Sequence, residues 1–339
     1  MNPELVGELV CPRCASGLSL ESAERDAAGG ISRGALHCAV CAARFPVIGG
    51  IPRFVPAENY CDSFGLEWNL YSRTQMDKFN GRHDSRDRLL RESQWTLEEL
   101  SGQRILECGS GAGRFTDVLL RAGAKVFTFD FSSAVEANDA NNGPHPNLFL
   151  VQADIYAIPF RKASFDKVLC FGVLQHTPDV RRAFMSMVPY LRPGGKIAVD
   201  VYPKHWRYLC HWKYLLRPFT RRMDRRRLHR IVERAVPWLL PVSLALGRTP
   251  LIGKQLVRLV PVSNPEMTLP GLSAATLRQW ATLDTFDWLS PAYDHPQTLR
   301  TLRAWFQEAG LEGAGIDHMA VYVGRGRMPG GAVGLTTAK

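Results

Sequence analysis

The sequence lacks a long apolar segment. No apolar run reaches the ~18 residues that a helix needs to span a bilayer. The N-terminal segment MNPELVGELVCPRC also lacks a basic flank followed by an apolar stretch, so a secretory signal is not indicated. We therefore expect a cytoplasmic protein. A length of 339 residues, with 45% hydrophobic and 22% charged residues, suits one substantial domain and a smaller module.

Cysteine is too scarce for a disulfide-stabilised scaffold, because 339 residues contain only eight. Four cysteines stand alone: Cys61, Cys108, Cys170 and Cys210. Cys108 and Cys170 fall in apolar segments that we expect to be buried strands, where a free thiol packs as a small hydrophobic group.

The other four cysteines form two C-x-x-C pairs, Cys11 with Cys14 and Cys38 with Cys41, separated by 23 residues. Two such pairs can supply four thiolates to a tetrahedral Zn²⁺. Four thiolates leave no open coordination position, so the spacing predicts a structural zinc ion. The alternative is a ribbon that has lost its metal and keeps free thiols.

The residues around these pairs, LVCPRCASGLSL and LHCAVCAARFPVIGGIP, add to this interpretation. A leucine lies shortly ahead of each pair, and the segment ends in FPV-x-x-GIP. In these features residues 1–57 resemble the zinc-ribbon activator protein of tRNA and other methyltransferases. The resemblance implies an adaptor or stabilising module, here fused in front of its enzyme.

Acidic residues are sparse in one segment. Residues 204–234 contain eleven Lys and Arg against two acidic residues and carry a charge of +9, whereas the remaining chain carries only +1. Aromatic residues are interleaved with the basic ones. Three interpretations stay open: a solvated helix face over a cleft, a contact with an anionic acceptor or a membrane surface at which the protein is peripheral, and RNA binding.

A short apolar run breaks into three alternate glycines in ILECGSGAGRF, residues 105–115. The pattern predicts a strand, a tight turn and a helix that together approach a nucleoside ligand. Glu107 precedes the first glycine by two residues. An acidic group there would repel the pyrophosphate of a dinucleotide and could accept a hydrogen bond from an ammonium group.

Alternating strand and helix signals continue downstream, and they predict an α/β fold. Asp130 lies 23 residues beyond Glu107, where a doubly wound domain places the carboxylate that binds both ribose hydroxyls. The expected fold is a doubly wound, mostly parallel, seven-stranded Rossmann-like sheet. The first five strands are expected at residues 105–108, 125–129, 149–153, 164–172 and 195–201.

Five blocks in order resemble class I S-adenosylmethionine-dependent methyltransferases. After E-x-G-x-G-x-G come Asp130, the QAD of residues 152–154, the FD of residues 165–166, VLQHTPD and LRPGGKIAV. The resemblance implies S-adenosylmethionine as the cofactor. The cofactor-binding residues that it implies are Glu107, Gly109, Gly111, Gly113, Asp130, Phe131, Asp154, Ile155, Phe171 and Gly172.

The resemblance also suggests roles for these side chains. Glu107 would orient the methionine ammonium group, Asp130 would bind the ribose, and Asp154 would accept from the adenine amino group. Taken singly, each glycine could be a turn former and each aspartate a helix cap. Asp166 precedes a strand and is expected to position backbone rather than cofactor.

His176 is the titratable residue of these blocks that could face the transferred methyl group. An imidazole with a pKa near ~6.5 can accept a proton from an attacking hydroxyl or amine. His176 could equally be a spectator that caps the next helix.

The expected domain organisation follows from these segments. The ribbon spans residues 1–57, a connector or N-terminal lid 58–102, the methyltransferase core 103–202 and 297–327, a basic helical lid insertion 203–296, and a tail 328–339. Within the connector, leucines predict one helix over 88–100, and the possible cofactor contacts are Trp68, Tyr71, Gln75 and Arg82. Within the insertion, apolar spacing predicts a helix over 221–236 that Pro237 ends.

Residues 283–296, at the end of the insertion, are polar, aromatic and rich in proline, which indicates a functional loop. The candidate acceptor-binding residues are Asp287, Tyr293, Asp294 and His295. The alternative is an ordered turn in which these side chains bond to backbone.

The sequence favours a methyltransferase that acts on a hydroxyl or amine of a small molecule, a glycan or a lipid-linked acceptor. One alternative is an RNA methyltransferase in which the ribbon and the basic segment hold phosphates. Another is a module that binds the cofactor without turnover and serves as an interaction partner.

Overall fold

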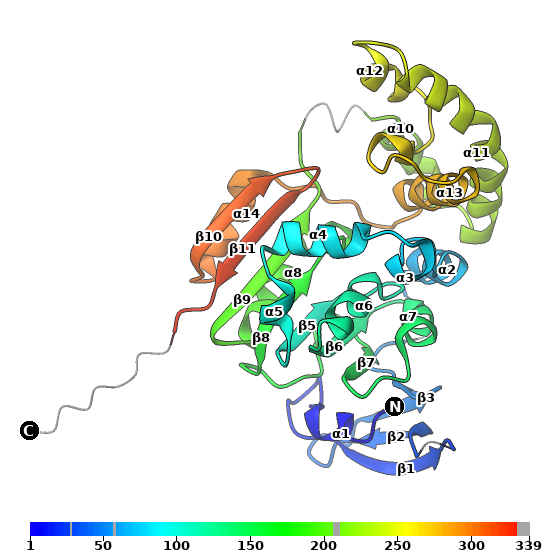
Figure 1. Cartoon of the computed structure of the whole chain (residues 1–339). Helices are drawn as coiled ribbons and strands as arrows, with labels where there is room; N and C mark the ends of the chain where they lie inside the picture. Colours follow the sequence, from blue (N-terminus) through cyan, green and yellow to red (C-terminus); the bar gives the residue numbers. More distant parts are fainter. Residues whose placement is uncertain (28, 57–58, 206–210, 331–339) are drawn as a thin grey trace, which may run out of the picture.

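A seven-stranded sheet forms the centre of the protein (Figure 1), and its strand order is β10-β11-β9-β8-β5-β6-β7. The computed structural model describes residues 1–27, 29–56, 59–205 and 211–330. Two parts of the chain named above lie outside the described residues. They are residues 206–210 of the basic segment, which include Cys210, and the end of the expected tail at 331–339. Strands β5 to β9 are parallel to one another, and β11 is antiparallel to both β9 and β10. The expected fold class is confirmed.

The first five strands fall near the predicted segments, although β9 begins at Leu191 rather than at residue 195. The strand bounds are β5 Arg104–Cys108, β6 Lys125–Asp130, β7 Leu148–Gln152, β8 Phe165–Cys170, β9 Leu191–Val201, β10 Glu312–His318 and β11 Tyr322–Arg327. Every residue of β7 and β8 is buried. Continuous burial is typical of parallel strands covered by helices on both faces.

Two sets of helices cover the sheet. On one face, α4 (Asp84–Ser93), α6 (Arg114–Arg121) and α7 (Ala134–Asn142) bury a core that includes Leu89 and Phe115. On the other, α8 (Val180–Met187) and α14 (Leu299–Glu308) pack through Phe184 and Phe306. Three short 3₁₀ helices connect the elements: η1 Leu174–His176, η2 Val188–Tyr190 and η3 Pro265–Met267.

The single helix expected over 88–100 is wrong. Helix α4 ends at Ser93, because Gln94 takes the left-handed conformation with φ +59°. Thr96 then caps a separate helix, α5 (Leu97–Leu100), by accepting from the Glu99 amide. The leucine spacing does not reveal this break.

The N-terminal segment forms a small four-stranded sheet of its own. Its elements are α1 Leu5–Glu8, β1 Ser19–Arg25, β2 Ile31–His37, β3 Arg44–Ile48 and β4 Ile51–Pro52. Leu9 bridges Phe160, and Arg53, just after β4, bridges Gln152 at the edge of β7. Glu8 accepts two hydrogen bonds from Arg104, at 3.0 and 2.7 Å. The ribbon therefore shares its core with the central domain.

Helices from two parts of the chain gather above the carboxyl ends of the strands (Figure 1). They are α2 Asp62–Leu70, α3 Asp77–Asn80, α10 Trp212–Thr220, α11 Arg225–Gly247, α12 Gly253–Val257 and α13 Ala274–Leu289. Leu228, Val232 and Phe286 belong to a separate hydrophobic core in this group, against which Leu66 of α2 packs. None of the described helices is both long and apolar enough to cross a membrane.

Two expectations for the insertion are wrong. Pro237 does not end the helix, because α11 continues through Pro237 and Pro241. Buried Val236 and Leu240 hold this part of α11 on the separate hydrophobic core of these helices, here called the lid core. Residues 283–289 are not a loop but the last turns of α13, which Ser273 caps by accepting from the Thr276 amide. The residues of α13 upstream of the polar stretch are already helical and partly buried, and the helix continues into that stretch.

Candidate functional site

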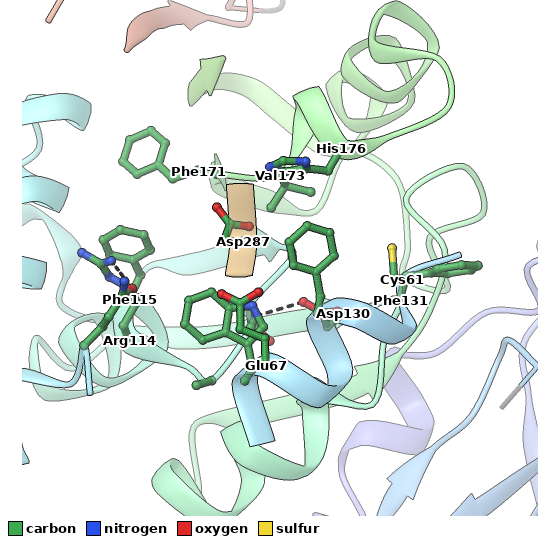
Figure 2. Close-up of a pocket in the computed structure, with 18 of the residues that line it drawn as sticks. Cys61, Glu67, Arg114, Phe115, Asp130, Phe131, Phe171, Val173, His176 and Asp287 are labelled. Atoms are coloured by element: carbon green, nitrogen blue, oxygen red, sulfur yellow. Dashed lines mark hydrogen bonds between the residues drawn. The ribbon is translucent and has the colours of Figure 1, made fainter. Parts of the chain in front are cut away.

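A cavity of about 290 Å³ lies at the carboxyl ends of β5, β6 and β8, beneath α2 and α13 (Figure 2). This edge of the sheet is the general ligand site of doubly wound folds. Of the predicted residues, these line the cavity: Gly109, Gly111, Asp130, Phe131, Ile155, Phe171, Gly172, His176 and Asp287. Trp68, Tyr71 and Gln75 also line it, whereas Arg82 does not and instead pairs with Asp84.

The glycine turn brings backbone to the cavity wall. Gly109 has φ +79°, and a Cβ atom there would lie 2.3 Å from a methyl carbon of Val173. Gly111 has φ +52°, and its Cβ would lie 3.2 Å from the Trp68 ring. Both positions therefore need glycine for conformation and for space.

Gly113 plays a different part. Its φ is +86°, and a Cβ would collide with the side chains of Asn138 and Asn142 of α7, at 2.3 and 2.2 Å. Gly113 is not among the cavity residues. Its lack of a side chain serves the packing of α6 against α7.

Asp130 ends β6 and turns its carboxylate toward the glycine turn. Oδ2 accepts from the Gly111 amide at 2.9 Å, and Oδ1 accepts from the Ser132 amide and hydroxyl. Burial raises the pKa of Asp130, while these hydrogen bonds favour its charged form. Phe131 follows it, with its ring 4.8 Å from that of Tyr60.

Glu107 lies below the turn rather than in the cavity. It is buried, and its Oε2 accepts from the Thr116 hydroxyl at 2.5 Å. Its Oε1 has no hydrogen-bond partner among the described residues. Burial raises the pKa of Glu107 to about 7. A buried acceptor that lacks a donor suits an ammonium group reached through the loop or a water.

Four other predicted residues lie outside the cavity lining. Asp154 accepts from the Tyr156 amide at 2.9 Å. Asp294 pairs with Lys213 at 2.9 Å, and this ion pair holds helix α10 against the loop that follows α13. Tyr293 and His295 bond through backbone, the former with the His176 ring and the latter with the Gln175 carbonyl.

His176 does reach the cavity, from η1. Its Nδ1 lies 3.0 Å from the Tyr293 carbonyl oxygen. A proton on Nδ1 would satisfy that contact and leave Nε2 as the acceptor of the ring. Burial lowers the pKa of His176 and keeps the ring neutral at physiological pH.

The lid side of the cavity holds carboxyl groups that motif reasoning missed. Glu67 of α2 and Asp284 of α13 line it beside the predicted Asp287. Figure 2 shows Glu67 and Asp287 facing each other from the two helices. Glu67 has 0% exposure, and neither of its carboxyl oxygens has a hydrogen-bond partner among the described residues.

Burial raises the pKa of all three of these lid carboxyl groups, and each is raised further by at least one other carboxylate. The pKa of Asp284 reaches about 7. Cations also line the cavity, but they have partners: Arg88 pairs with Asp200 at 2.5 Å and Arg114 donates to Gln75 at 2.5 Å. The apolar residues of α2 show little helical periodicity in the sequence, so no sequence pattern indicates that Glu67 is buried.

The four ribbon cysteines come together away from the cavity. Their Sγ atoms lie within 4.8 Å of one another. Cys11 and Cys41 are 3.5 Å apart at sulfur, and Cys14 and Cys38 are 3.4 Å apart. With Zn–S bonds of ~2.3 Å, a tetrahedral site needs sulfur atoms ~3.8 Å apart, so the cluster fits a zinc ion.

Comparison with known proteins agrees with this geometry. A family model described as a methyltransferase domain matches residues 106–199, which hold the glycine turn and strands β5 to β9. Residues 106–199 are thus similar to a methyltransferase domain. S-adenosylmethionine is the cofactor expected for a domain of this kind.

Curated relatives match the methyltransferase domain. A ubiquinone biosynthesis O-methyltransferase of Albidiferax ferrireducens is 31% identical over 100 residues, which are 28% of this chain and 40% of that protein. A demethylmenaquinone methyltransferase of Thermobifida fusca is 27% identical over 135 residues, which are 36% of this chain and 57% of that protein. The chain thus matches only about half the length of these relatives.

The solved structures that match this chain are more distant in sequence. A chain from the Haloferax volcanii complex of a methyltransferase activator with a methyltransferase has 15% identity and a TM-score of 0.45, covering 79% of this chain and 98% of its own. A methyltransferase structure from Methanococcus maripaludis has 14% identity and a TM-score of 0.45, covering 82% and 98%.

Proposed function

We propose that the protein is an S-adenosylmethionine-dependent methyltransferase that methylates an oxygen or nitrogen atom of a small-molecule, glycan or lipid-linked acceptor. One observation carries the proposal: a single cavity joins the glycine turn and Asp130 to a lid wall rich in polar and aromatic groups. The first half suits the cofactor, and the second is available for an acceptor.

The cofactor half has features that fit S-adenosylmethionine. Asp130 would bind the ribose hydroxyls, with Phe131 and Ile155 beside the adenine. Gly109 and Gly111 would admit the methionine part close to backbone, and Glu107 would bind its ammonium group from below. When bound, the cofactor supplies an electrophilic methyl group on a sulfonium, so in-line alignment provides much of the rate.

Substitution of Asp130 tests this assignment. Because Asp130 offers the carboxylate at the end of β6, Asp130→Ala should weaken S-adenosylmethionine binding at least about tenfold, the effect of losing a charge-assisted hydrogen bond. Titration calorimetry measures the affinity, with Asp87→Ala on the exposed face of α4 as the control. Unchanged affinity in Asp130→Ala would refute the cofactor site.

A small-molecule acceptor is supported by the relatives, whose names refer to quinone biosynthesis. Transfer to a hydroxyl or amine releases one proton. We assign its removal to the neutral ring of His176, whose Nε2 is the acceptor nitrogen when Nδ1 donates to Tyr293. His176 thus acts as the general base in this proposal.

A structural Zn²⁺ held by the four ribbon cysteines is the second part of the proposal. The clustered sulfur atoms support it, because thiolates at this separation suit tetrahedral coordination. The ion would stabilise the ribbon and, through the shared core, the methyltransferase domain.

The third part concerns the outer face of α11. Ile231, Trp238 and Val242 are 47%, 80% and 50% exposed, and their spacing aligns them with exposed Arg227 and Arg234. An apolar stripe with tryptophan and arginine suits the boundary of an anionic membrane. We therefore propose that the lid contacts a membrane surface and there collects a lipid-linked acceptor.

A further inference from the structure

The three carboxyl groups on the lid side of the cavity, Glu67, Asp284 and Asp287, have no role in the proposed cofactor site. Glu67 is fully buried and lacks a hydrogen-bond donor among the described residues. Asp284 accepts from the Ser263 hydroxyl at 3.1 Å, and Asp287 accepts from the Tyr202 hydroxyl at 3.5 Å. Burying polar groups with so few partners costs free energy unless a ligand supplies donors.

We propose that this carboxyl wall binds an ammonium group, so that the methyl acceptor carries a protonated amine. Where the amine nitrogen itself is methylated, the bound ammonium first gives one proton to His176, because only the free amine has a lone pair that can attack the methyl group. The inference rests on the proposed methyltransferase function and specifies its acceptor. An ammonium group brings both a positive charge and up to three N–H donors. A neutral hydroxyl would bring a single donor and no charge to pair with the carboxylates that ammonium binding ionises.

Burial outweighs the cations that face the wall. It raises the pKa of Asp287 although Lys213 lowers it, and it raises the pKa of Asp284 although Arg114 lowers it. Lys213 and Arg217 lie on α10, where both pair with Asp294, at 2.9 and 3.8 Å. His176 is kept neutral by burial. Arg114 donates to the neutral side chain of Gln75 and also faces Asp284 from the cofactor side. The carboxyl wall therefore remains the acidic part of the cavity.

Aromatic rings complete the same half of the cavity. Phe64 and Trp68 come from α2, Tyr202 follows β9, and Trp288 ends α13. The face of an aromatic ring attracts a cation, and desolvation strengthens that attraction. Aromatic and carboxyl groups thus favour the same kind of ligand.

Matched pairs of probes separate charge from shape. We choose tyramine with 4-ethylphenol and ethanolamine with ethylene glycol, because each pair differs by an amine. Titration calorimetry on the full chain saturated with S-adenosylhomocysteine should give at least about tenfold tighter binding of one amine than of its partner. Equal affinities in both pairs would overturn the inference.

Glu67→Gln keeps the shape of the side chain and removes its charge, so it should abolish the amine preference. Asp62→Asn, an exposed carboxylate on the same helix, is the matched control and should keep it. Asp287→Asn provides a second variant if Glu67→Gln does not fold. If Glu67→Gln and Asp287→Asn both keep the amine preference, the amine binds at another site and the inference is overturned.

Proton release gives an independent readout. Ammonium binding should ionise carboxyl groups that are protonated in the free protein, so wild-type protein should release protons that Glu67→Gln does not. Calorimetry in buffers of different ionisation enthalpy measures this release. The absence of release by wild-type protein on tyramine binding would contradict recognition by the carboxyl wall.

The sulfonium of the cofactor is also a cation, and the two ligands are distinguished by affinity. If Glu67→Gln weakens S-adenosylmethionine but not S-adenosylhomocysteine, the wall serves the sulfonium and the inference is overturned. If neither cofactor form binds wild-type protein, the proposed function itself fails. Cofactor binding without any amine preference refutes the inference alone.

The source of the amine is resolved by the form in which it is offered. Methyl transfer to vesicles of phosphatidylethanolamine and phosphatidylglycerol, but not to soluble ethanolamine, would assign a lipid headgroup. Transfer to soluble amines alone would assign a free small molecule. Both results support an amine acceptor, whereas methylation of the hydroxyl partners at equal rates would contradict it.

Discussion

Burial sets the acid–base properties of individual side chains in the cavity. Asp284 illustrates the effect: desolvation and neighbouring Asp287 raise its pKa to about 7. Unfolding returns this carboxyl to its ordinary pKa of 3.8. Folding therefore favours the protonated form, and its contribution to stability is present below pH 3.8 and is lost as the pH rises through about 7.

This sign predicts the effect of Asp284→Asn. At pH 8 the substitution removes a buried charge and should raise Tm by roughly 3 °C. At pH 5 the carboxyl is largely protonated in the folded protein and only part of the stability has been lost, so the rise in Tm should be clearly smaller. Calorimetric melts at both pH values measure the difference. An equal change in Tm at the two pH values would mean that Arg114, which also faces Asp284, already compensates the charge of the Asp284 carboxylate.

His176→Asn tests the proposed base. The amide can still donate to the Tyr293 carbonyl but cannot take up a proton, so kcat should fall about 100-fold while cofactor affinity is kept. Burial lowers the pKa of His176, so wild-type activity should rise with pH through a value below 6.5. That acidic limb should disappear from the pH profile of His176→Asn. A retained limb would make His176 a spectator.

At the scale of elements, α11 has two faces with different partners. Leu228, Val232 and Val236 pack into the lid core. The opposite face presents Ile231 and Trp238 to solvent. Sequence periodicity identifies the buried face, but exposure of the second apolar stripe becomes clear only when the partners of the helix are known.

Charge reversal on the exposed face tests membrane contact. Arg227→Glu with Arg234→Glu should reduce binding to phosphatidylglycerol vesicles at least tenfold, since each basic residue contributes about 1 kcal/mol near an anionic surface. Sedimentation with vesicles measures binding. Arg300→Glu with Arg303→Glu on α14 is the matched control.

Two results would contradict the membrane assignment. Equal losses in the α11 and α14 pairs would indicate a general charge effect. Retention of RNA at moderate salt by wild-type protein, without vesicle binding, would favour the RNA alternative, because RNA contacts weaken steeply with salt.

At the scale of the whole molecule, the ribbon and the methyltransferase domain share one core. Leu9 and Leu36 belong to the same buried cluster as Phe127 and Phe160. Arg53 donates to Gln152 and Glu136, on β7 and α7. The ribbon and the domain should therefore unfold together.

Metal removal tests this coupling. Metal analysis should find about one zinc per chain, and Cys38→Ser should lower the Tm of the whole chain by roughly 10 °C in a single transition. Iron, or no metal, would refute the zinc site. A separate early transition with an unchanged main Tm would show that the ribbon does not stabilise the domain.

The sequence alone determined the sheet and the side of the cavity formed by the glycine turn and Asp130. The glycines of residues 105–115, Asp130 and the apolar strands act through local conformation and regular spacing, so a short segment contains the whole signal. The break at Gln94 and the course of α11 through Pro237 were not predictable in this way, because a left-handed residue and long-range packing decided them.

The tertiary structure alone decided the lid side of the cavity. Glu67 and Asp284 are more than 200 residues apart in the sequence, and no local pattern distinguishes either from a solvated carboxylate. They meet only because α2 and α13 pack together over the strand ends. Burial there removes water and turns ordinary acidic residues into the carboxyl wall, a consequence of packing that spacing cannot reveal.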